Sequence, residues 1–304
     1  MGEKDFWSTE TYEAVASFVP HFADTLVQSI EFSPTDRVLD IGCGDGKFTT
    51  SFSPVVGYVM GVDSSPAMIE AAKKLDYGGA VTDFRVVDCR LLNKEVDIVN
   101  GNWDKVASNA ALHWVLRDPT TRVSTLETVF RSLKPGGTFF FEMCGFGNAP
   151  EMVTSYIFAL VNHGIPIEKA EEMCPWFHPS DDYMKGLLED IGFQVQKIDL
   201  KPKPLKMNPE INGGLEGFMG LLGAPWLDLL DTEEKKKSAL KQMCRMLRHG
   251  TTKEDGTLPV ITPIVLVEHS QGEPSTCASE VYHRAQGRTF SRNKGTRSHR
   301  VKDE

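Results

Sequence analysis

Short apolar runs alternate with longer segments of helical periodicity along most of the chain. Runs that are almost continuously apolar are typical of strands buried on both faces, as in a parallel sheet. Strands are predicted at residues 37–41, 58–62, 84–87, 104–108, 138–143, 193–200 and 260–267. Their alternation with helices predicts an α/β fold with a doubly wound, mostly parallel seven-stranded sheet and right-handed crossovers.

Helix signals flank these strands. An amphipathic helix is predicted from about Thr9 to Ile30, bent near Pro20 because a proline ring disfavours helix interiors. Helix-like residues follow the first strand from Lys47 to Phe52. The segment Ser64-Ser65-Pro66 predicts another helix start, with a hydroxyl cap and a proline in the first turn.

Two insertions lie outside the strand and helix alternation. Both carry helical patterns rich in Met, Trp and Phe, and both follow strands that border the expected ligand crevice, so we expect them to roof it. Near the carboxyl terminus apolar residues become rare and basic residues outnumber acidic ones, which is typical of a disordered tail. The predicted organisation is an amino-terminal helical cap at 1–33, a sheet domain at 34–269 with insertions at about 145–180 and 208–250, and a basic tail at 270–304.

The first predicted strand ends in a glycine-rich turn. The run is Val38-Leu39-Asp40-Ile41-Gly42-Cys43-Gly44-Asp45-Gly46, and its alternate glycines suggest positive φ angles or a backbone that a ligand approaches closely. A dinucleotide-binding fingerprint has two residues between its second and third glycines, whereas Asp45 stands alone there and Lys47 takes the place of the third glycine. An ordinary tight turn between a strand and a helix is the alternative interpretation.

Acidic residues end the next two predicted strands. Asp63 is placed at the end of the second strand, where a short carboxylate can accept both hydroxyls of a ribose. Asp88 follows the third strand and could accept a hydrogen bond from the exocyclic amine of adenine; a helix cap or a solvated loop acid is the alternative. Together with the glycine turn, these positions predict a nucleoside pocket at the carboxyl ends of the strands.

Composition narrows the range of functions. With 304 residues and 40% apolar content, the chain can bury one large α/β core plus helical additions. A net charge of −9 argues against a strong nucleic-acid binder and favours a small-molecule partner. No stretch approaches the roughly 18 apolar residues of a transmembrane helix and the start is no signal peptide, so we expect a cytoplasmic protein without a membrane partner. The six cysteines lack metal-ligand spacing, so we expect reduced thiols and no metal.

As a set, these motifs resemble those of class I S-adenosylmethionine-dependent methyltransferases. The matching segments, in the family's order and spacing, are VLDIGCGDG at 38–46, GVDSSPAMIEAAKK at 61–74, VVDCR at 86–90, WDKVASNAALHW at 103–114 and LKPGGTFFF at 133–141. Within the family, NAALHW at 109–114 and WSTETY at 7–12 look most like the branch that holds trans-aconitate methyltransferase and malonyl-carrier carboxyl methyltransferase.

The resemblance implies a Rossmann-like methyltransferase fold whose seventh strand runs antiparallel, with S-adenosyl-L-methionine as the cofactor. It implies that amides of the glycine turn hold the methionine carboxylate, and that Asp40 orients the turn or the amino group. The implied cofactor-binding residues are Asp40, Gly42, Gly44, Asp63, Ser64, Asp88, Cys89 and Asn109.

The expected reaction is methyl transfer to a small molecule, with a carboxyl or hydroxyl oxygen as the preferred acceptor. N- or C-methylation of a small metabolite is an alternative, because this fold hosts all three chemistries. A non-catalytic S-adenosylmethionine-binding protein is a further alternative. A nicotinamide-dependent reductase is weaker, since the glycine spacing at Lys47 departs from the dinucleotide fingerprint.

Aromatic residues and one histidine are the candidates for the acceptor side. His113 follows the fourth predicted strand where the substrate should meet the methyl group, and an imidazole pKa of about 6.5 suits a catalytic base. An ionised carboxylate acceptor needs no base, and a histidine packed beside Trp114 is the alternative. The face of Trp114 could favour the sulfonium by cation–π attraction. The candidate substrate-binding residues are Trp7, Tyr12, His113, Trp114, Trp176 and Trp226.

Overall fold

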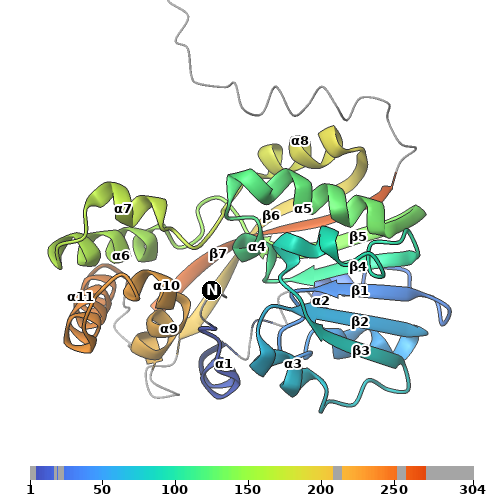
Figure 1. Ribbon diagram of the computed structural model, residues 1–304. Coiled ribbons are helices and arrows are strands. Elements are labelled where there is room, and N and C mark those ends of the chain that lie inside the picture. Colours follow the sequence, from blue (N-terminus) through green and yellow to red (C-terminus); the bar gives the residue numbers. More distant parts are fainter. Residues whose placement is uncertain (1–4, 17–18, 20–23, 208–213, 252–257, 272–304) are drawn as a thin grey trace, which may run out of the picture. The chain divides into compact units, whose positions relative to one another are not determined.

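The computed structural model places seven strands in one sheet (Figure 1). It describes residues 5–16, 19, 24–207, 214–251 and 258–271, so the predicted tail lies outside the described residues from 272 onward. The strands are β1 (Arg37–Ile41), β2 (Tyr58–Asp63), β3 (Val81–Val86), β4 (Trp103–Asn109), β5 (Leu133–Cys144), β6 (Phe193–Met207) and β7 (Leu258–Gln271). Their order in the sheet is β3-β2-β1-β4-β5-β7-β6.

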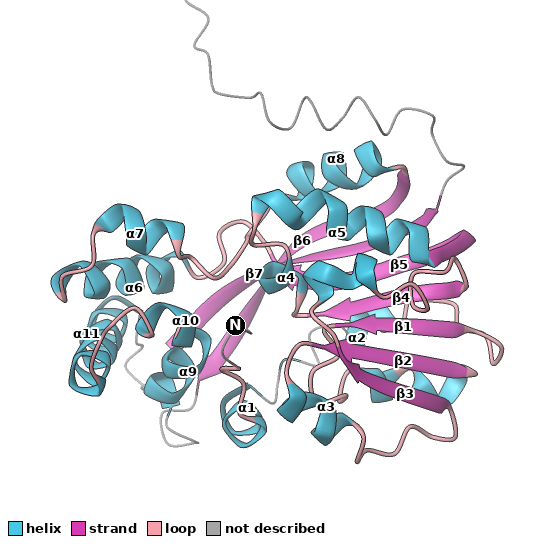
Figure 2. Cartoon of the chain, in the orientation of Figure 1, coloured by secondary structure: helices cyan, strands magenta, loops and turns pink. Residues whose placement is uncertain are grey.

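Parallel pairing runs from β3 through β2, β1 and β4 to β5. β7 pairs antiparallel with β5, and β6 pairs antiparallel with β7. The predicted doubly wound, mostly parallel sheet is therefore confirmed, including its antiparallel seventh strand. Because the parallel strands point the same way, their carboxyl ends lie along one edge of the sheet, where ligands bind in this class of fold (Figure 2).

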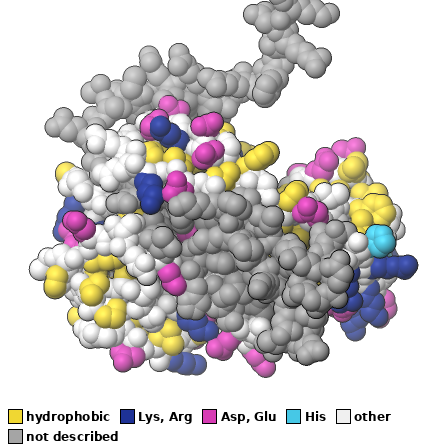
Figure 3. Space-filling view, turned by 180° about the vertical axis from the view of Figure 1, so that it is seen from behind, with side chains coloured by type: hydrophobic (Ala, Val, Ile, Leu, Met, Phe, Trp, Pro, Cys, Tyr) yellow, Lys and Arg dark blue, Asp and Glu magenta, His cyan; other side chains and the backbone are white. Residues whose placement is uncertain are grey.

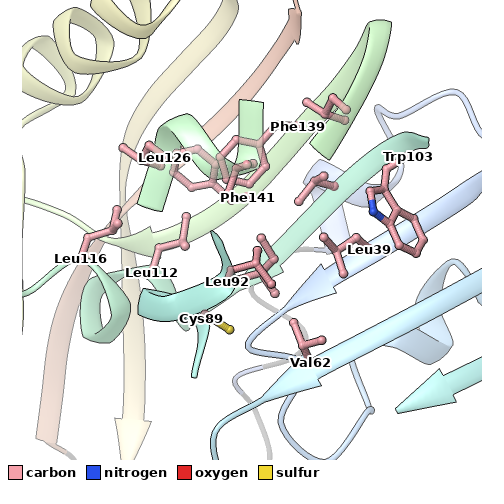
Figure 4. Close-up of a cluster of buried hydrophobic side chains, with 14 of the residues drawn as sticks. Leu39, Val62, Cys89, Leu92, Trp103, Leu112, Leu116, Leu126, Phe139 and Phe141 are labelled. Carbon is pink, nitrogen blue, oxygen red and sulfur yellow. The ribbon is translucent and has the colours of Figure 1, made fainter. Parts of the chain in front are cut away.

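Helices cover both faces of the sheet. On one face lie α4 (Leu112–Val115), α5 (Pro119–Ser132) and α8 (Asp181–Ile191), and on the other lie α2 (Asp24–Val27) and α3 (Pro66–Ala72). The phenylalanine run of β5 serves both faces, because successive side chains of a strand point to opposite sides. Phe139 and Phe141 pack with Leu39 and Trp103 in the first core (Figure 4), whereas Phe140 packs in the second.

The amino-terminal helix differs from its prediction. Instead of one helix reaching Ile30 there are α1 (Thr9–Ala16) and the short α2, and Val19 between them lies in a 3-10 turn. Pro20, the predicted bend, lies outside the described residues. Ile30 is buried against the sheet from a turn, so its apolar character reflects core packing and not helical periodicity.

The predicted helix after the glycine turn is wrong. Two 3-10 turns, Thr49–Ser51 and Ser53–Val55, take its place before β2 begins. Pro54 stands in the first turn of the second one, and proline cannot continue a helix because it lacks an N–H and its ring clashes with an earlier carbonyl.

The helix start at Ser65 is confirmed. The Ser65 hydroxyl accepts a hydrogen bond from the Met68 amide (3.2 Å), and Pro66 occupies the first turn of α3. Proline is well placed there because the first amides of a helix have no partner within the helix.

The two insertions form a cap with a hydrophobic core of its own. From the first insertion come α6 (Pro150–Asn162) and α7 (Ile167–Glu172); from the second come α9 (Gly214–Leu222), α10 (Ala224–Leu227) and α11 (Glu233–Thr251). The fully buried side chains that join them include Tyr156, Met219, Trp226 and Met243. In Figure 1 these helices lie beyond the carboxyl ends of the parallel strands.

β6 and β7 carry the second insertion beyond the sheet. The pairing of β7 with β5 stops at Cys144 opposite Ile264, whereas its pairing with β6 continues to Met207 opposite Leu258. Residues 202–207 and 258–263 therefore form a two-stranded ribbon beyond the sheet, and α9, α10 and α11 come between its strands in the chain.

The described surface carries charges of both signs. On the face seen in Figure 3, Lys and Arg side chains are interspersed with Asp and Glu side chains. None of the helices in the described part of the chain is long and apolar enough to cross a membrane.

Candidate functional site

A cavity of about 550 Å³ opens at the carboxyl ends of the parallel strands, and this volume is typical of small-molecule sites. Most of the predicted cofactor residues line it: Gly42, Gly44, Asp63, Ser64, Asp88, Cys89 and Asn109. From the acceptor-side prediction, Trp7, Tyr12 and Trp114 line it as well. The remaining predicted site residues, Asp40, His113, Trp176 and Trp226, are not among the described residues that line the cavity.

The glycine turn after β1 needs its glycines. Gly42, Gly44 and Gly46 have φ angles of 70°, 54° and 81°, a region that side chains rarely adopt. A Cβ atom on Gly42 would lie 2.2 Å from the Cβ of Ala111, so a larger residue cannot fit without moving the chain after β4. The turn therefore brings bare backbone to the wall of the cavity.

The amides of this turn are already used within the protein. Those of Gly42 and Cys43 donate to the Val62 carbonyl (2.8 and 3.1 Å), and that of Gly44 donates to the Asp63 carboxylate (3.0 Å). Because these three amides have partners within the protein, the implied role of the turn amides in holding the methionine carboxylate stays a prediction. The turn allows close approach of a ligand to the backbone.

Asp40 lies beneath the glycine turn. It is fully buried in β1, and its Oδ2 accepts a hydrogen bond from the Thr49 hydroxyl (2.6 Å). Burial raises its pKa to about 7, against the effect of the Thr49 hydrogen bond, and the charge of Asp63 adds to the rise. Of its two expected roles, orienting the turn is the one that this position allows directly.

Two backbone donors hold the Asp63 side chain at the end of β2. Its Oδ2 accepts from the Gly44 amide (3.0 Å) and its Oδ1 from the Ser65 amide (2.9 Å). Burial raises the pKa of this carboxyl, and the two hydrogen bonds oppose the rise. Since a carboxylate has about four acceptor sites, both oxygens keep capacity for hydroxyl donors in the cavity.

Asp88 fits both roles considered from the sequence, a ligand-binding residue and a helix cap. It lines the cavity, and it also caps the 3-10 helix Cys89–Lys94 by accepting from the Arg90 amide (3.0 Å). Its Oδ2 pairs with the Arg90 guanidinium (2.7 Å). Burial acts to raise the pKa of Asp88, but the hydrogen bonds from Arg90 outweigh it and the pKa is lowered, so Asp88 is a carboxylate at neutral pH.

Asn109 is the last residue of β4, and only one end of its side-chain amide has a hydrogen-bond partner among the described residues. Its Nδ2 donates to the Val19 carbonyl (3.4 Å), whereas its buried Oδ1 has no hydrogen-bond partner among the described residues. A buried acceptor left unsatisfied costs about 1–3 kcal/mol, which a ligand donor would recover. Ala110 follows with a φ of 53°, so the chain turns sharply at this point.

His113 is buried behind the cavity wall. Only 6% of its surface is exposed, and its Nδ1 accepts a hydrogen bond from the Cys144 amide (3.4 Å). Burial lowers its pKa to about 3, and His178, whose ring centre lies 6.3 Å away, adds to the effect. His113 therefore fits the alternative interpretation, a histidine packed beside Trp114. The structure does not support its use as a catalytic base.

The predicted tryptophans divide into two groups. Trp114 lines the cavity and contacts Trp7 edge-to-face, with ring centres 5.3 Å apart. Trp176 lies behind Trp114 (5.6 Å) and contacts Trp226 (5.4 Å). Trp226 is fully buried in the cap core and donates its indole N–H to the Ala170 carbonyl (2.8 Å), so it packs the cap and does not face the cavity.

Several lining residues were not predicted. They are Asp5, Phe6, Pro66, Met68, Val86, Arg90, Ala110, Ala111, Val115, Arg117, Leu221 and Pro225. Many are sequence neighbours of predicted residues, and that adjacency is the signal that could have found them. Leu221 and Pro225 come from the second insertion, whereas no described residue of the first insertion lines the cavity, so only one of the two predicted roof segments reaches it.

Comparison with known proteins identifies the family. The family described as "Methyltransferase domain" matches residues 39–141. An uncharacterized methyltransferase from Schizosaccharomyces pombe is 35% identical over 215 residues, which cover 71% of this chain and 81% of that protein. The chain belongs to the S-adenosylmethionine-dependent methyltransferases. S-Adenosylmethionine is the cofactor of this methyltransferase, which rules out the reductase interpretation.

Other relatives match a smaller part of the methyltransferase. Malonyl-[acyl-carrier protein] O-methyltransferase from Priestia megaterium is 28% identical over 163 residues, covering 51% of this chain and 55% of that protein. A ubiquinone/menaquinone biosynthesis C-methyltransferase from Vibrio vulnificus is 26% identical over 175 residues, covering 53% and 65%. The crystal structure of the YcgJ protein from Bacillus subtilis has the same fold, with a TM-score of 0.54 at 16% identity over 83% of this chain and 99% of that one.

Proposed function

We propose that this methyltransferase acts on a small molecule, with a carboxyl or hydroxyl oxygen as the preferred acceptor atom. The observation that carries the proposal is the roofed cavity of about 550 Å³. Cavities of this size hold small ligands and bury most of their surface. Leu221 and Pro225 of the cap contribute to its lining, so the second insertion takes part in choosing the acceptor.

The residues present fit S-adenosylmethionine. The positive-φ turn at Gly42 and Gly44 offers a backbone cradle that a Cβ atom would fill, and the buried Oδ1 of Asn109 offers an acceptor for the methionine amino group. We assign Asp63, with Ser64 beside it, to the ribose. Asp88 and Cys89 flank the adenine. We assign Asp40, which accepts a hydrogen bond from the Thr49 hydroxyl, to orienting the glycine turn.

The chemistry places few demands on side chains. Bound S-adenosylmethionine supplies an electrophilic methyl group, to which an acceptor lone pair bonds as the carbon–sulfur bond breaks. The protein holds the acceptor in line with that methyl group, and such positioning accounts for about 7–11 kcal/mol of barrier in well-oriented cases. When the cofactor is bound, the Trp114 ring, which lines the cavity, would stabilise the positive sulfur by about 0.5–2 kcal/mol. An ionised carboxyl acceptor has no proton to lose, and a hydroxyl acceptor releases its proton to water or to a nearby carboxylate.

Two observations support an oxygen acceptor. The motifs NAALHW at 109–114 and WSTETY at 7–12 resemble the branch of trans-aconitate and malonyl-carrier methyltransferases. The Priestia megaterium relative is named an O-methyltransferase. C-methylation is the second candidate, because the Vibrio vulnificus relative is named a C-methyltransferase.

The domain organisation that serves this function is an amino-terminal cap at 1–33 and a cofactor-binding sheet domain at 34–269. We propose that the insertions at about 145–180 and 208–250 form one substrate cap. Their shared hydrophobic core supports this division.

The experiment that tests the function is calorimetric titration of the protein with S-adenosylhomocysteine. Binding in the micromolar range, about −8 kcal/mol, is expected. Asp63→Ala should abolish it, whereas Asp231→Ala, an exposed carboxylate of the cap, should leave it unchanged. A panel of acids, phenols and carbon acceptors with labelled methyl donor then identifies the acceptor. Wild-type protein that binds no S-adenosylhomocysteine would contradict the proposal.

A further inference from the structure

Three aromatic side chains line the cavity without being fully packed. Trp7 contacts Tyr12 and Trp114 edge-to-face, with ring centres 5.9 and 5.3 Å apart. All three are half-buried, whereas Trp103 and Trp226 elsewhere in the chain are buried to 1% or less. We name Trp7, Tyr12 and Trp114 the aromatic trio. Its partly exposed rings leave apolar area against the cavity that a flat ligand can cover.

Carboxylates border the trio. Burial, and then the nearby charges of Asp45, Glu142 and Asp63, raise the pKa of Tyr12 well above its usual value, so its phenol keeps its proton and remains a hydrogen-bond donor. The geometry agrees with this environment: the Asp5 carboxylate accepts a hydrogen bond from the Trp7 amide (2.9 Å), and Asp5 and Asp63 line the same cavity as the trio. Asp45 and Glu13, by contrast, are both paired with Lys47 (3.2 and 3.0 Å). Glu142 is the register partner of Asn109, which lines the cavity.

The positive charge in the cavity lies near Asp88. Among the described lining residues, the basic ones are Arg90 and Arg117. Arg90 pairs with Asp88 (2.7 Å), and Arg117 interacts electrostatically with the same carboxylate. Both cations therefore interact with the Asp88 carboxylate, in the part of the cavity assigned to adenine.

We propose that the aromatic trio forms the acceptor site, and that it takes an uncharged acceptor with a flat apolar body in preference to an anionic one. This inference rests on the proposed function and narrows it from a carboxyl or hydroxyl oxygen to a neutral hydroxyl. An anionic acceptor would meet the carboxylates that border the trio, and a cationic acceptor would meet the positive sulfur of the cofactor. A neutral ring with a hydroxyl group is repelled neither by the carboxylates nor by the positive sulfur. Its hydroxyl oxygen can accept a hydrogen bond from Tyr12.

The test is calorimetric titration of the full-length protein, saturated with S-adenosylhomocysteine at pH 7, with three probes that share one ring system: 2-naphthol, 2-naphthoate and 2-naphthylmethylammonium. 2-Naphthol should bind at least tenfold more tightly than either charged probe. Trp7→Leu and Trp114→Leu should each weaken 2-naphthol binding about tenfold. Phe158→Leu, at an exposed cap residue that does not line the cavity, should leave it unchanged.

Other results overturn the inference. Equal or tighter binding of 2-naphthoate or of the ammonium probe contradicts the charge argument, and binding of none of the three contradicts the acceptor site itself. Retained S-adenosylhomocysteine binding shows that the tryptophan variants are folded. Loss of S-adenosylhomocysteine binding by the wild-type protein would instead refute the proposed function, so the two failures are distinguishable.

Discussion

The cofactor side of the cavity and its cap side are built from different kinds of sequence. On the cofactor side, each residue stands within a few positions of a strand end, and local hydrogen bonds hold it, as the Gly44 and Ser65 amides hold Asp63. On the cap side, the lining comes from the second insertion, as at Leu221 and Pro225. A site built from strand ends can therefore be predicted from short sequence motifs, whereas a site built from insertions that pack together cannot.

Replacing the buried tryptophan of the cap is the strongest way to separate the two sides. Trp226→Ala should lower the free energy of unfolding by about 3–5 kcal/mol, because it empties the centre of the cap core and removes the hydrogen bond to Ala170. Chemical denaturation measures this loss, and Trp226→Phe should cost less. If the sides are independent, S-adenosylhomocysteine affinity changes less than about threefold; a loss comparable to that of Asp63→Ala would show that they are one unit.

Gly42→Ala attacks the cofactor side alone. The new Cβ would lie 2.2 Å from Ala111 at a φ of 70°, so S-adenosylhomocysteine affinity should fall at least about a hundredfold, or about 2.7 kcal/mol. Gly136→Ala is the matched control, since Gly136 has a φ of 78° with no atom near a new Cβ and does not line the cavity. Equal effects of the two variants on calorimetric affinity would mean that backbone strain, and not the clash, governs the site.

Lowering the pH should decrease the free energy of unfolding through two buried histidines, His113 and His178. Burial lowers the pKa of His113 to about 3 and that of His178 to about 4, below the ordinary value of about 6.5. The unfolded chain therefore binds protons that the folded protein excludes, so these groups stabilise the fold above about pH 6.5 and lose that contribution as pH falls toward their folded pKa values. Unfolding free energy should drop by about 1–3 kcal/mol between pH 6.5 and 5.

The control for this pH effect is a neutral replacement. His178→Gln should flatten the pH dependence of the unfolding free energy in that interval, although it lowers stability at pH 8. A slope that persists unchanged in this variant and in His113→Gln would assign the acid sensitivity to carboxylates.

The smallest effect concerns the link from the amino-terminal helix to the glycine turn. Lys47 pairs with Glu13 of α1 (3.0 Å) and with Asp45 of the turn (3.2 Å). Partly exposed ion pairs contribute about 0.2–1 kcal/mol, so Lys47→Ala should weaken S-adenosylhomocysteine binding about two- to fivefold, and less at high salt. Lys235→Ala, which removes a similar pair with Asp231 on the cap, should have no effect on this affinity.

The strands were predictable because their signal is local. A run of apolar residues bounded by turn residues specifies a buried strand without knowledge of its neighbours, and all seven predicted strands occur in the sheet. The helix predicted from Lys47 to Phe52 failed for the opposite reason. Its residues permit a helix, but two 3-10 turns form there, and Pro54 prevents an α-helix from continuing toward β2.

Residue type and spacing placed the glycine turn, Asp63, Asp88 and Asn109 at strand ends, and the parallel sheet then brings these ends to one cavity. Packing between segments far apart in the sequence determined which other side chains line the cavity and which are buried. His113 is one residue from Trp114, yet the histidine is buried and the tryptophan lines the cavity, because the chain after β4 turns at Ala110 and meets β5 and the segment at Phe177. A pattern of neighbouring residues carries no information on which side chain distant segments will cover, so burial, pKa and cavity lining emerge only when the chain has folded.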